Sequence, residues 1–251
     1  QEPAVVPGFS FEGRYSEMPV GDDLLLGLSG QESFQQLLAR LKKIPADDQV
    51  KAIVVLGGTT TLGRGQVEEV RQVMKEIQEA GKQIHAHADL LTMHGYVLLS
   101  GADQVSVVPT GDVWLTGIYG ESLHLRGMLD KISVTPDFLT CGDYKSAAEM
   151  FTRTEPSPEA DENLNWLLDS LFDSYVRLIA EGRQISEETA RQWIDQGLVS
   201  TSQAKEMGIV DHVEYRHDLE ARLKSQLGDD LKFDRKYGRE KGLEIDFSSP
   251  L

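Results

Sequence analysis

The chain has 251 residues and is strongly acidic, because 41 Asp and Glu residues outnumber 25 Lys and Arg residues and give a formal net charge of −16. This charge opposes binding to nucleic acid, and the most basic stretch, 232–242, also contains Asp234 and Glu240. The single cysteine excludes an intrachain disulfide and a multi-cysteine metal site. A hydrophobic content of 40% is sufficient for a substantial core. No run approaches the roughly 18 apolar residues that span a bilayer.

The first fifty residues predict an extended segment followed by a strand, a helix and a second strand. Residues 1–23 are rich in Pro and Gly and lack periodicity, which indicates an extended lead-in. The short apolar run 24–30 predicts a buried strand. Apolar residues spaced by three and four predict a helix over 34–41, which Pro45 ends. The β-branched run 51–58 predicts a central strand that leads into a glycine turn.

The next segments continue the alternation of helices and strands. Apolar spacing predicts an amphipathic helix over 67–77, ended at Gly81. A strand at 82–89, a short apolar helix at 95–103 and a strand at 104–109 follow. Strands and helices that alternate at this spacing predict right-handed βαβ crossovers and a mainly parallel sheet. The fold class is therefore α/β.

The C-terminal part is predicted to be mostly helical. A long apolar stripe predicts a helix over 158–182, with Ser157 as its N-cap. Two short helices are predicted at 186–196 and 202–207. The apolar residues of 208–215 predict a strand that closes the globular part.

Several motifs in this order resemble the signal peptide peptidase A family of serine peptidases. They are HADLLTMHGYVLLSGAD (87–103), LDKISV (129–134), GDYKSAAEMFTR (142–153), SPEAD (157–161) and AKEMGIVDHV (204–213). The resemblance implies a crotonase-like (Clp-protease-like) α/β fold, with a mainly parallel β-sheet, repeated ββα/βαβ units and flanking helices. On this basis we expect a lead-in at 1–23, a crotonase-like half-domain at 24–227, and a charged tail or linker at 228–251.

The resemblance assigns a catalytic lysine but no nucleophile. In that family the lysine of a Y-K-S motif is the general base for a serine that follows the third strand. Carried over by motif, the lysine is Lys145 and the serine position is Met93. Long members are tandem duplications in which the first half supplies the lysine and the second half the serine. The chain therefore resembles a lysine-bearing first half, and a second half or a neighbouring subunit would supply the serine.

A lysine can act as this base only in its neutral form. An unperturbed lysine has a pKa of about 10.4, and burial can lower the pKa of a lysine by roughly 3–5 units. Tyr144, Phe151 and the small residues between them could provide an apolar surrounding, and the hydroxyl of Ser146 could orient the amine. The spacing alone also fits a lysine at a helix start that is exposed or paired with Glu149.

Acyl transfer also needs hydrogen-bond donors for the oxyanion. The turn LGGTTTLG (56–63) follows a central strand, and the amides of Gly57 or Gly58 could serve as such donors. The alternative is a tight turn without a catalytic role. In related enzymes the residue after the nucleophile offers a second amide, which here is His94.

Other clusters allow competing interpretations. His85, His87 and His94 lie within ten positions, and the first two have the spacing of metal ligands. Only Asp89 could complete a ligand set, so we expect hydrogen-bonded histidines in the interior or in a cleft, with no metal and no cofactor.

Two nucleophilic arrangements can also be drawn from the sequence. Cys141 precedes Lys145 by four positions, but a lone cysteine is more often a buried small hydrophobe. Ser122, His124 and Asp130 could form a triad on paper, although no elbow motif accompanies them.

The function implied by the resemblance is a membrane-associated Ser/Lys endopeptidase that degrades remnant signal peptides. It further implies a peptide substrate, a homo-oligomer and a bacterial cell envelope location on the periplasmic or extracytoplasmic side. The anchor is not in this chain, which begins with Gln1 and is expected to be processed or trimmed. Two alternatives remain. One is an inactive scaffold for assembly or partner binding, which Met93 favours; the other is an acyl-CoA enzyme, although no basic site for nucleotide phosphates is evident.

Overall fold

A computed structural model describes residues 4–18 and 32–239. The chain divides into two compact units. The first contains the residues up to Thr116 together with those from Leu178 onward, and the second contains Gly117–Arg177. The predicted strand at 24–30 lies outside the described residues.

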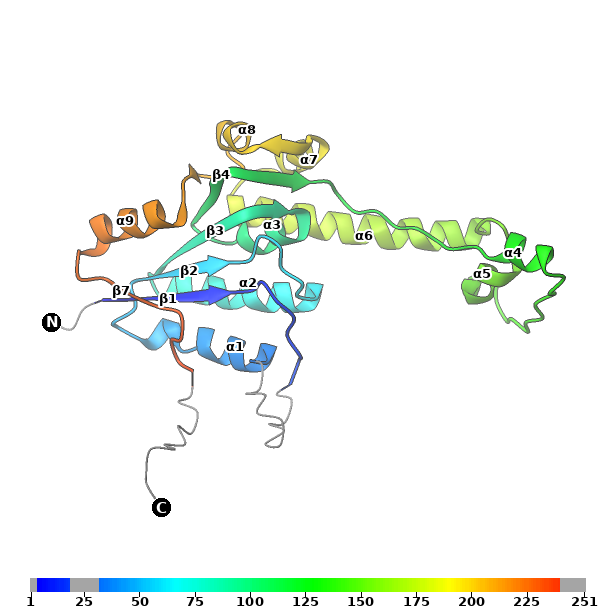
Figure 1. Cartoon of the computed structure of the whole chain (residues 1–251), viewed down its shortest axis with the longest axis horizontal. Helices are drawn as coiled ribbons and strands as arrows, with labels where there is room; N and C mark the ends of the chain where they lie inside the picture. The colour runs from blue at the N-terminus through cyan, green and yellow to red at the C-terminus, as the bar shows by residue number, and fades with distance from the viewer. Residues whose placement is uncertain (1–3, 19–31, 240–251) are drawn as a thin grey trace, which may run out of the picture. The chain divides into compact units, whose positions relative to one another are not determined.

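The first unit is built on a mainly parallel seven-stranded sheet (Figure 1). Its strands are β1 (Val5–Ser10), β2 (Ala52–Leu56), β3 (Gln83–Thr92), β4 (Gln104–Leu115), β5 (Gly197–Ser200), β6 (His212–Val213) and β7 (Lys232–Asp234). They are arranged in the order β5-β4-β3-β2-β1-β7, with β6 also paired to β4. Among these described strands, only β4 and β5 pair in antiparallel fashion. The predicted α/β class with a mainly parallel sheet is confirmed.

Most helices of the first unit lie where the sequence predicted them. They are α1 (Phe34–Leu41), α2 (Arg64–Glu79), α3 (Met93–Leu99), α7 (Glu187–Asp195), α8 (Thr201–Glu206) and α9 (Arg216–Leu227), with a 3₁₀ turn η1 (Ile44–Ala46). Ser33 caps α1 and Ser200 caps α8, each in a reciprocal capping box with a glutamine three residues on. Gly81 has φ +77°, a left-handed conformation that suits a glycine just after α2.

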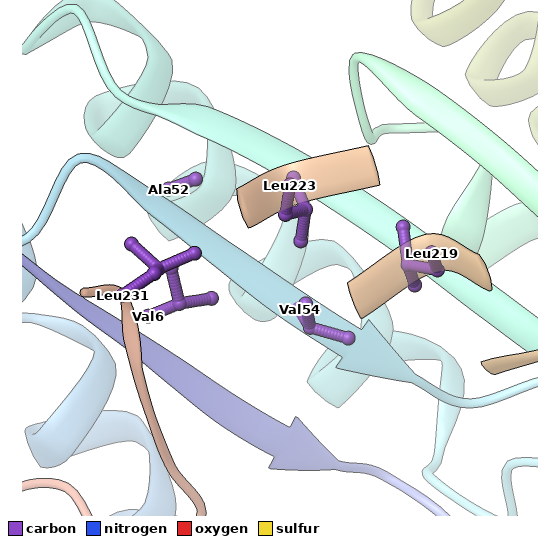
Figure 2. Packing of buried hydrophobic residues seen from close by; sticks show 6 residues of the cluster. All are labelled: Val6, Ala52, Val54, Leu219, Leu223 and Leu231. Carbon is purple, nitrogen blue, oxygen red and sulfur yellow. The ribbon is translucent and has the colours of Figure 1, made fainter. Parts of the chain in front are cut away.

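Helix α9 covers part of one face of the sheet. Side chains of β3 alternate, so Ile84 and Ala86 point away from the face that carries His85 and His87. His85 is paired in register with Val54 of β2, which places both on the face covered by α9. Figure 2 shows Leu219 and Leu223 of α9 together with Val6, Ala52, Val54 and Leu231. The two leucines of α9 therefore bury the apolar side chains of β1 and β2 on that face.

The N-terminal segment corrects one expectation. Residues 1–23 were expected to be an extended lead-in, but Val5–Ser10 forms β1, which pairs with β2 on one side and β7 on the other. Val6 and Phe9 are fully or almost fully buried. The segment lacks a recognisable pattern because Pro7 and Gly8 interrupt it. Hydrogen bonds from its neighbours and burial of Val6 and Phe9 decide its conformation, rather than intrinsic propensity.

The C-terminal segment corrects a second expectation. The strand predicted at 208–215 is limited to His212–Val213, and the sequence did not predict a helix at 216–227, where α9 lies. The expected charged tail from residue 228 includes β7, whose pairing with β1 continues the sheet. Only two residues of α9, Leu219 and Leu223, are buried. Such a sparse apolar stripe gives little periodic signal in the sequence.

The second unit has helices but almost no interior. It contains α4 (Arg126–Lys131), the 3₁₀ turn η2 (Ser146–Ala148), α5 (Glu149–Thr152) and most of α6 (Pro158–Arg183). Between residues 117 and 174, all of which the structure describes, the only buried residue is Ser157. Eleven large apolar side chains are exposed: Tyr119, Leu123, Met128, Ile132, Val134, Phe138, Leu139, Tyr144, Met150, Trp166 and Leu167. A unit of this composition does not bury its own apolar surface.

Candidate functional site

The strand-to-helix elbow after β3 is fully formed, but it carries no nucleophile. Thr92 is extended, with φ −85° and ψ 162°, and its Oγ1 accepts a hydrogen bond from the amide of Gly95 at 3.2 Å. Met93 is the first residue of α3 and is 6% exposed. A thioether has no proton to lose and does not serve as an acyl-transfer nucleophile. The backbone of the elbow is therefore formed, but the side chain at its first helical position is not a nucleophile.

The glycine turn after β2 lies directly against this elbow. The carbonyl oxygen of Gly58 accepts hydrogen bonds from the amide of Thr92 at 3.0 Å and from its Oγ1 at 2.9 Å. The amide of Thr60 donates to the carbonyl of Gly57 at 3.1 Å. Within residues 4–18 and 32–239, no acceptor is found for the amides of Gly57 and Gly58. The structure thus brings Gly57, Gly58 and Met93 together, and the oxyanion role of the two amides stays a prediction.

Lys145 lies in the second unit, on a short exposed turn. It is the N-cap of η2, with φ −89° and ψ 68°, and its amide donates to the carbonyl of Gly142 at 3.1 Å. Gly142 has φ +95°, a conformation that favours glycine and lets the chain reverse here. The Lys145 side chain is exposed, and so is Tyr144 at 56%. Among the described residues, the expected apolar enclosure of this lysine is therefore not formed, because the residues around it in the second unit are exposed or only half-buried.

The nearest carboxylate in sequence, Glu149, is not paired with the lysine. Its two oxygens accept hydrogen bonds from the Oγ of Ser157 at 2.6 Å and from the amide of Ser157 at 2.8 Å. These bonds hold the pKa of Glu149 below its ordinary value, with the hydroxyl contributing most. No ion pair of Lys145 is found in the part of the chain that the structure describes. The spacing alone allowed a lysine that is exposed or one that is paired with Glu149, and in the structure the lysine is exposed.

The residues beside Lys145 differ in their contacts. The hydroxyl of Tyr144 donates to Oε2 of Glu162 at 2.7 Å, and this bond, with the charge of Glu162, raises the pKa of Tyr144. Ser146 is half-buried, and no hydrogen bond from its hydroxyl to the Lys145 amine is found among the described residues. Tyr144 therefore links the lysine turn to α6, whereas an orienting role for Ser146 remains a prediction.

The two strand histidines lie inside the first unit. His85 and His87 are each 2% exposed, and Nδ1 of His87 lies 2.8 Å from Oγ of Ser106. Burial, followed by the charge of Arg222, lowers the pKa of His85 from 6.5 to about 4. His94 is separate from this pair, and its Nε2 donates to the carbonyl of Leu62 at 2.7 Å. Among the described residues, no group of three or more His, Cys, Asp or Glu side chains is placed to hold a metal ion.

The triad drawn from Ser122, His124 and Asp130 is not assembled. Nδ1 of His124 donates to the carbonyl of Arg153 at 3.2 Å, and the carboxylate of Asp130 is bound by Arg126. A triad with Ser122 is therefore not formed. Cys141 is exposed, which corrects the expectation of a buried small hydrophobe. The neighbouring residues 139–145 are also exposed, so no side chain covers the cysteine.

Sequence reasoning missed two side-chain contacts that connect the lysine turn to the start of α6, Glu149 to Ser157 and Tyr144 to Glu162. Ser157 was recognised as the N-cap of the long helix, and its Oγ does accept from the amide of Ala160 at 3.2 Å. Its second role, as a donor to Glu149, links residues eight apart across a proline-containing segment. A local pattern does not report such a contact.

Comparisons with known proteins match more than half of this chain. The model of Peptidase family S49 matches residues 76–229, which is more than half of the chain and includes both Met93 and Lys145. "Protease 4" from Haemophilus influenzae is 33% identical over 163 residues, covering 62% of this chain and 26% of that protein. "Serine protease SPPA, chloroplastic" from Arabidopsis thaliana is 24% identical over 209 residues, covering 83% of this chain and 31% of that protein. The chain thus spans about a quarter to a third of the length of these curated relatives.

A solved structure of a variant of the "1510-N membrane-bound stomatin-specific protease", in complex with a substrate peptide, matches with a TM-score of 0.50 at 12% identity. The match covers 93% of this chain and 91% of the other. This likeness supports the crotonase-like (Clp-protease-like) α/β fold class that the motifs implied. In the described residues, no helix is both long and apolar enough to cross a bilayer. The family match over residues 76–229 shows that the chain belongs to peptidase family S49.

Proposed function

We propose that this chain is the lysine-bearing half of a Ser/Lys serine endopeptidase, whose nucleophilic serine comes from a second half or from a neighbouring subunit. The observation that carries the proposal is the combination of a Y-K-S lysine on a tethered turn with Met93 at a complete but inert elbow. The chain holds a candidate base and lacks a candidate nucleophile at the expected position.

The proposed reaction is acyl-enzyme hydrolysis. The neutral amine of Lys145 takes the proton from the hydroxyl of the incoming serine as its oxygen attacks the scissile carbonyl carbon. The ammonium then gives this proton to the departing amine, so the peptide C–N bond breaks and an ester remains. Lys145 next takes a proton from water, whose oxygen attacks the ester. The same proton returns to the serine oxygen as the second product leaves.

The partner has a second task in this proposal, because a lysine can act as a general base only in its neutral form. Eleven exposed apolar side chains of the second unit offer a surface for contact, and several of them lie between Ile132 and Met150, around the lysine turn. A partner that covers this surface would also exclude water from Lys145 and favour its neutral form. Assembly and activation would then be the same event, in a homo-oligomer or in a tandem protein.

The substrates follow from the family resemblance rather than from the geometry. We infer peptides, and specifically remnant signal peptides, cleaved at the cell envelope by a membrane-associated assembly. A curated relative from Enterococcus faecium, 25% identical over 197 residues, is named "Putative signal peptide peptidase SppA". The nucleophile, the substrate and the membrane association are each open to direct measurement.

The test compares the isolated chain with the complete gene product from which it comes, using a quenched fluorescent peptide as substrate. We expect hydrolysis by the complete product and none by the chain alone. Lys145→Ala should abolish hydrolysis, whereas Lys131→Ala, which removes an exposed lysine of the same unit, should not. Hydrolysis by the chain alone would contradict the split site, and hydrolysis that survives Lys145→Ala would contradict the role of the base.

Met93 favours one alternative, an inactive scaffold that serves assembly or partner binding. On that alternative the complete gene product would show no hydrolysis, yet it would still form the same oligomer. Measuring the mass of the assembly alongside the peptide assay separates the two functions. Met93→Ser tests whether the inert elbow alone prevents activity, since the surrounding strand, cap and helix are in place.

A further inference from the structure

Two side-chain hydrogen bonds connect the residues on either side of Lys145 to the N-terminal part of α6. Glu149 begins α5 directly after η2, so no residue separates it from the turn that Lys145 caps. Its carboxylate receives both the amide and the hydroxyl hydrogen of Ser157, at 2.8 Å and 2.6 Å. On the other side of the lysine, Tyr144 donates to Glu162 on α6 at 2.7 Å. Both contacts connect the turn to the same helix.

The contact of Glu149 with Ser157 is the more strongly built of the two. Ser157 is the only buried residue between 117 and 174, at 7% exposure, whereas Tyr144 is 56% exposed. Bidentate acceptance by a charged oxygen pair fixes direction as well as distance. The same Ser157 hydroxyl also accepts from Ala160 and caps the 26-residue helix. A carboxylate at this end of a helix interacts favourably with its dipole.

The geometry points to Glu149 as a positioning residue that fixes the Lys145 turn on the N-terminus of α6 through Ser157. This inference rests on the proposed function, because it concerns the placement of the proposed base. Glu149 does not act on substrate itself. With its oxygens occupied by Ser157, it is also kept from pairing with the lysine four residues earlier, a pairing that would favour the ammonium form.

This arrangement explains how a turn without a buried core can still present a defined amine. Between residues 117 and 174 only Ser157 is buried, so directional hydrogen bonds rather than a packed core hold η2. Loss of one such bond should change the placement of Lys145 without removing α6, since Pro158, Glu159 and Asp161 still favour the start of that helix. The expected consequence is a defect in the catalytic step rather than in substrate binding.

The first experiment uses the chain as it is. Hydrogen exchange is followed on peptic peptides covering residues 140–151 in wild type, Glu149→Gln and Glu159→Gln. Glu149→Gln replaces one acceptor oxygen by a donor, and the amide of Lys145 should then exchange about tenfold faster because its bond to Gly142 is less constrained. Glu159→Gln removes a charge from the same helix end without removing this contact, and should exchange like wild type. Equal exchange in all three would overturn the inference.

The second experiment measures peptide hydrolysis by the complete gene product. Glu149→Gln should lower kcat by roughly tenfold with KM little changed, as expected for a misplaced base. Glu149→Asp, which keeps the charge, should recover part of kcat. Ser157→Ala should reproduce the defect, and the double variant should be no worse than either single one, because both remove the same contact. Unchanged kcat in Glu149→Gln, or a loss that appears only as reduced folding, would overturn the inference.

Lys145→Ala in the same assay separates this inference from the proposed function. If Lys145→Ala retains activity, the proposed function is wrong, and the positioning role of Glu149 is wrong as well. If Lys145→Ala is inactive while Glu149→Gln keeps full kcat, only the positioning role fails.

Discussion

Gly95 on α3 lies directly against the carbonyl group of Gly58, so closely that no side chain can be accommodated between them. A Cβ added to Gly95 would overlap the Gly58 carbonyl oxygen and would lie 2.9 Å from the carbonyl oxygen of Gly57. The obstructing atoms belong to backbone and cannot rotate away. The approach of the glycine turn to the elbow is therefore a fixed feature of this fold.

Gly95→Ala is accordingly expected to destabilise the protein. Forcing a methyl group against backbone costs about 1–3 kcal/mol or more. This should lower Tm by roughly 2–4 °C for each kcal/mol in a chain of this size. Gly65→Ala in α2 is the matched control, because no heavy atom lies within 4 Å of its added Cβ. An alanine in that helix should leave Tm unchanged or raise it slightly. Equal Tm values for both variants would contradict the close approach.

Leu223→Ala tests whether α9 belongs to the core. Leu223 is fully buried against the sheet cluster of Val6, Ala52 and Val54 (Figure 2). Truncating a buried leucine costs about 2–5 kcal/mol in the free energy of unfolding. Leu198→Ala, at a side chain that is 60% exposed, should change it by less than about 0.5 kcal/mol. Urea unfolding followed by circular dichroism measures both values. An unaffected midpoint for Leu223→Ala would mean that α9 does not support the sheet.

Stability should fall as the pH is lowered from 6.5 toward 4. In the folded state burial depresses the pKa of His85 to about 4, so in this range the unfolded chain binds the proton more tightly. The full loss from a pKa difference of this size is about 3 kcal/mol. Burial lowers the pKa values of His87 and His212 too, which adds a loss in the same direction.

The measurement is the free energy of unfolding in urea at a series of pH values from about 7 down to about 4.5, a range chosen to span the ordinary histidine pKa. His85→Asn, which cannot take up a proton, should show a shallower decline than wild type. His217→Asn, at a side chain that is 78% exposed, should follow wild type closely. A wild-type stability independent of pH over this range would show that His85 is not held neutral by burial.

The ion pair of Asp211 with Arg183 is expected to be a major polar support of the first unit. The Asp211 oxygens accept two hydrogen bonds from Arg183, each of 2.9 Å, and a third from the amide of Val105 at 2.7 Å. Burial alone would raise the pKa of Asp211, but these hydrogen bonds outweigh it and hold the pKa below its ordinary value of 3.8. The contribution is therefore fully present above that ordinary value and is lost as the pH falls through the folded pKa.

Asp211→Asn should cost about 2–4 kcal/mol in the free energy of unfolding at neutral pH, because it leaves the guanidinium of a largely buried arginine without its counter-charge. Asp195→Asn removes an exposed carboxylate at the end of α7 and should cost little. If the two variants were equally stable, the pair would contribute no more than a surface contact.

Elements whose side chains repeat regularly could be predicted from the order of residues. Val67, Val70 and Val73 indicated α2, the run 51–58 indicated β2, and Ser157 before an apolar stripe indicated the start of α6. The family could also be identified in this way, because the Y-K-S segment and its companion motifs are specific in residue type and order. In these segments local propensity and tertiary burial favour the same conformation, so a pattern along the chain was enough.

Features that depend on partners distant in the chain could not be predicted in this way. The strand at Val5–Ser10 exists because β2 and β7 pair with it, and α9 is held by two leucines that reach the sheet. The exposure of Lys145 and the engagement of Glu149 by Ser157 were equally beyond a local pattern. The motif selected the lysine, but whether a residue is buried or paired is set by all the atoms around it, and these come from segments far apart in the chain.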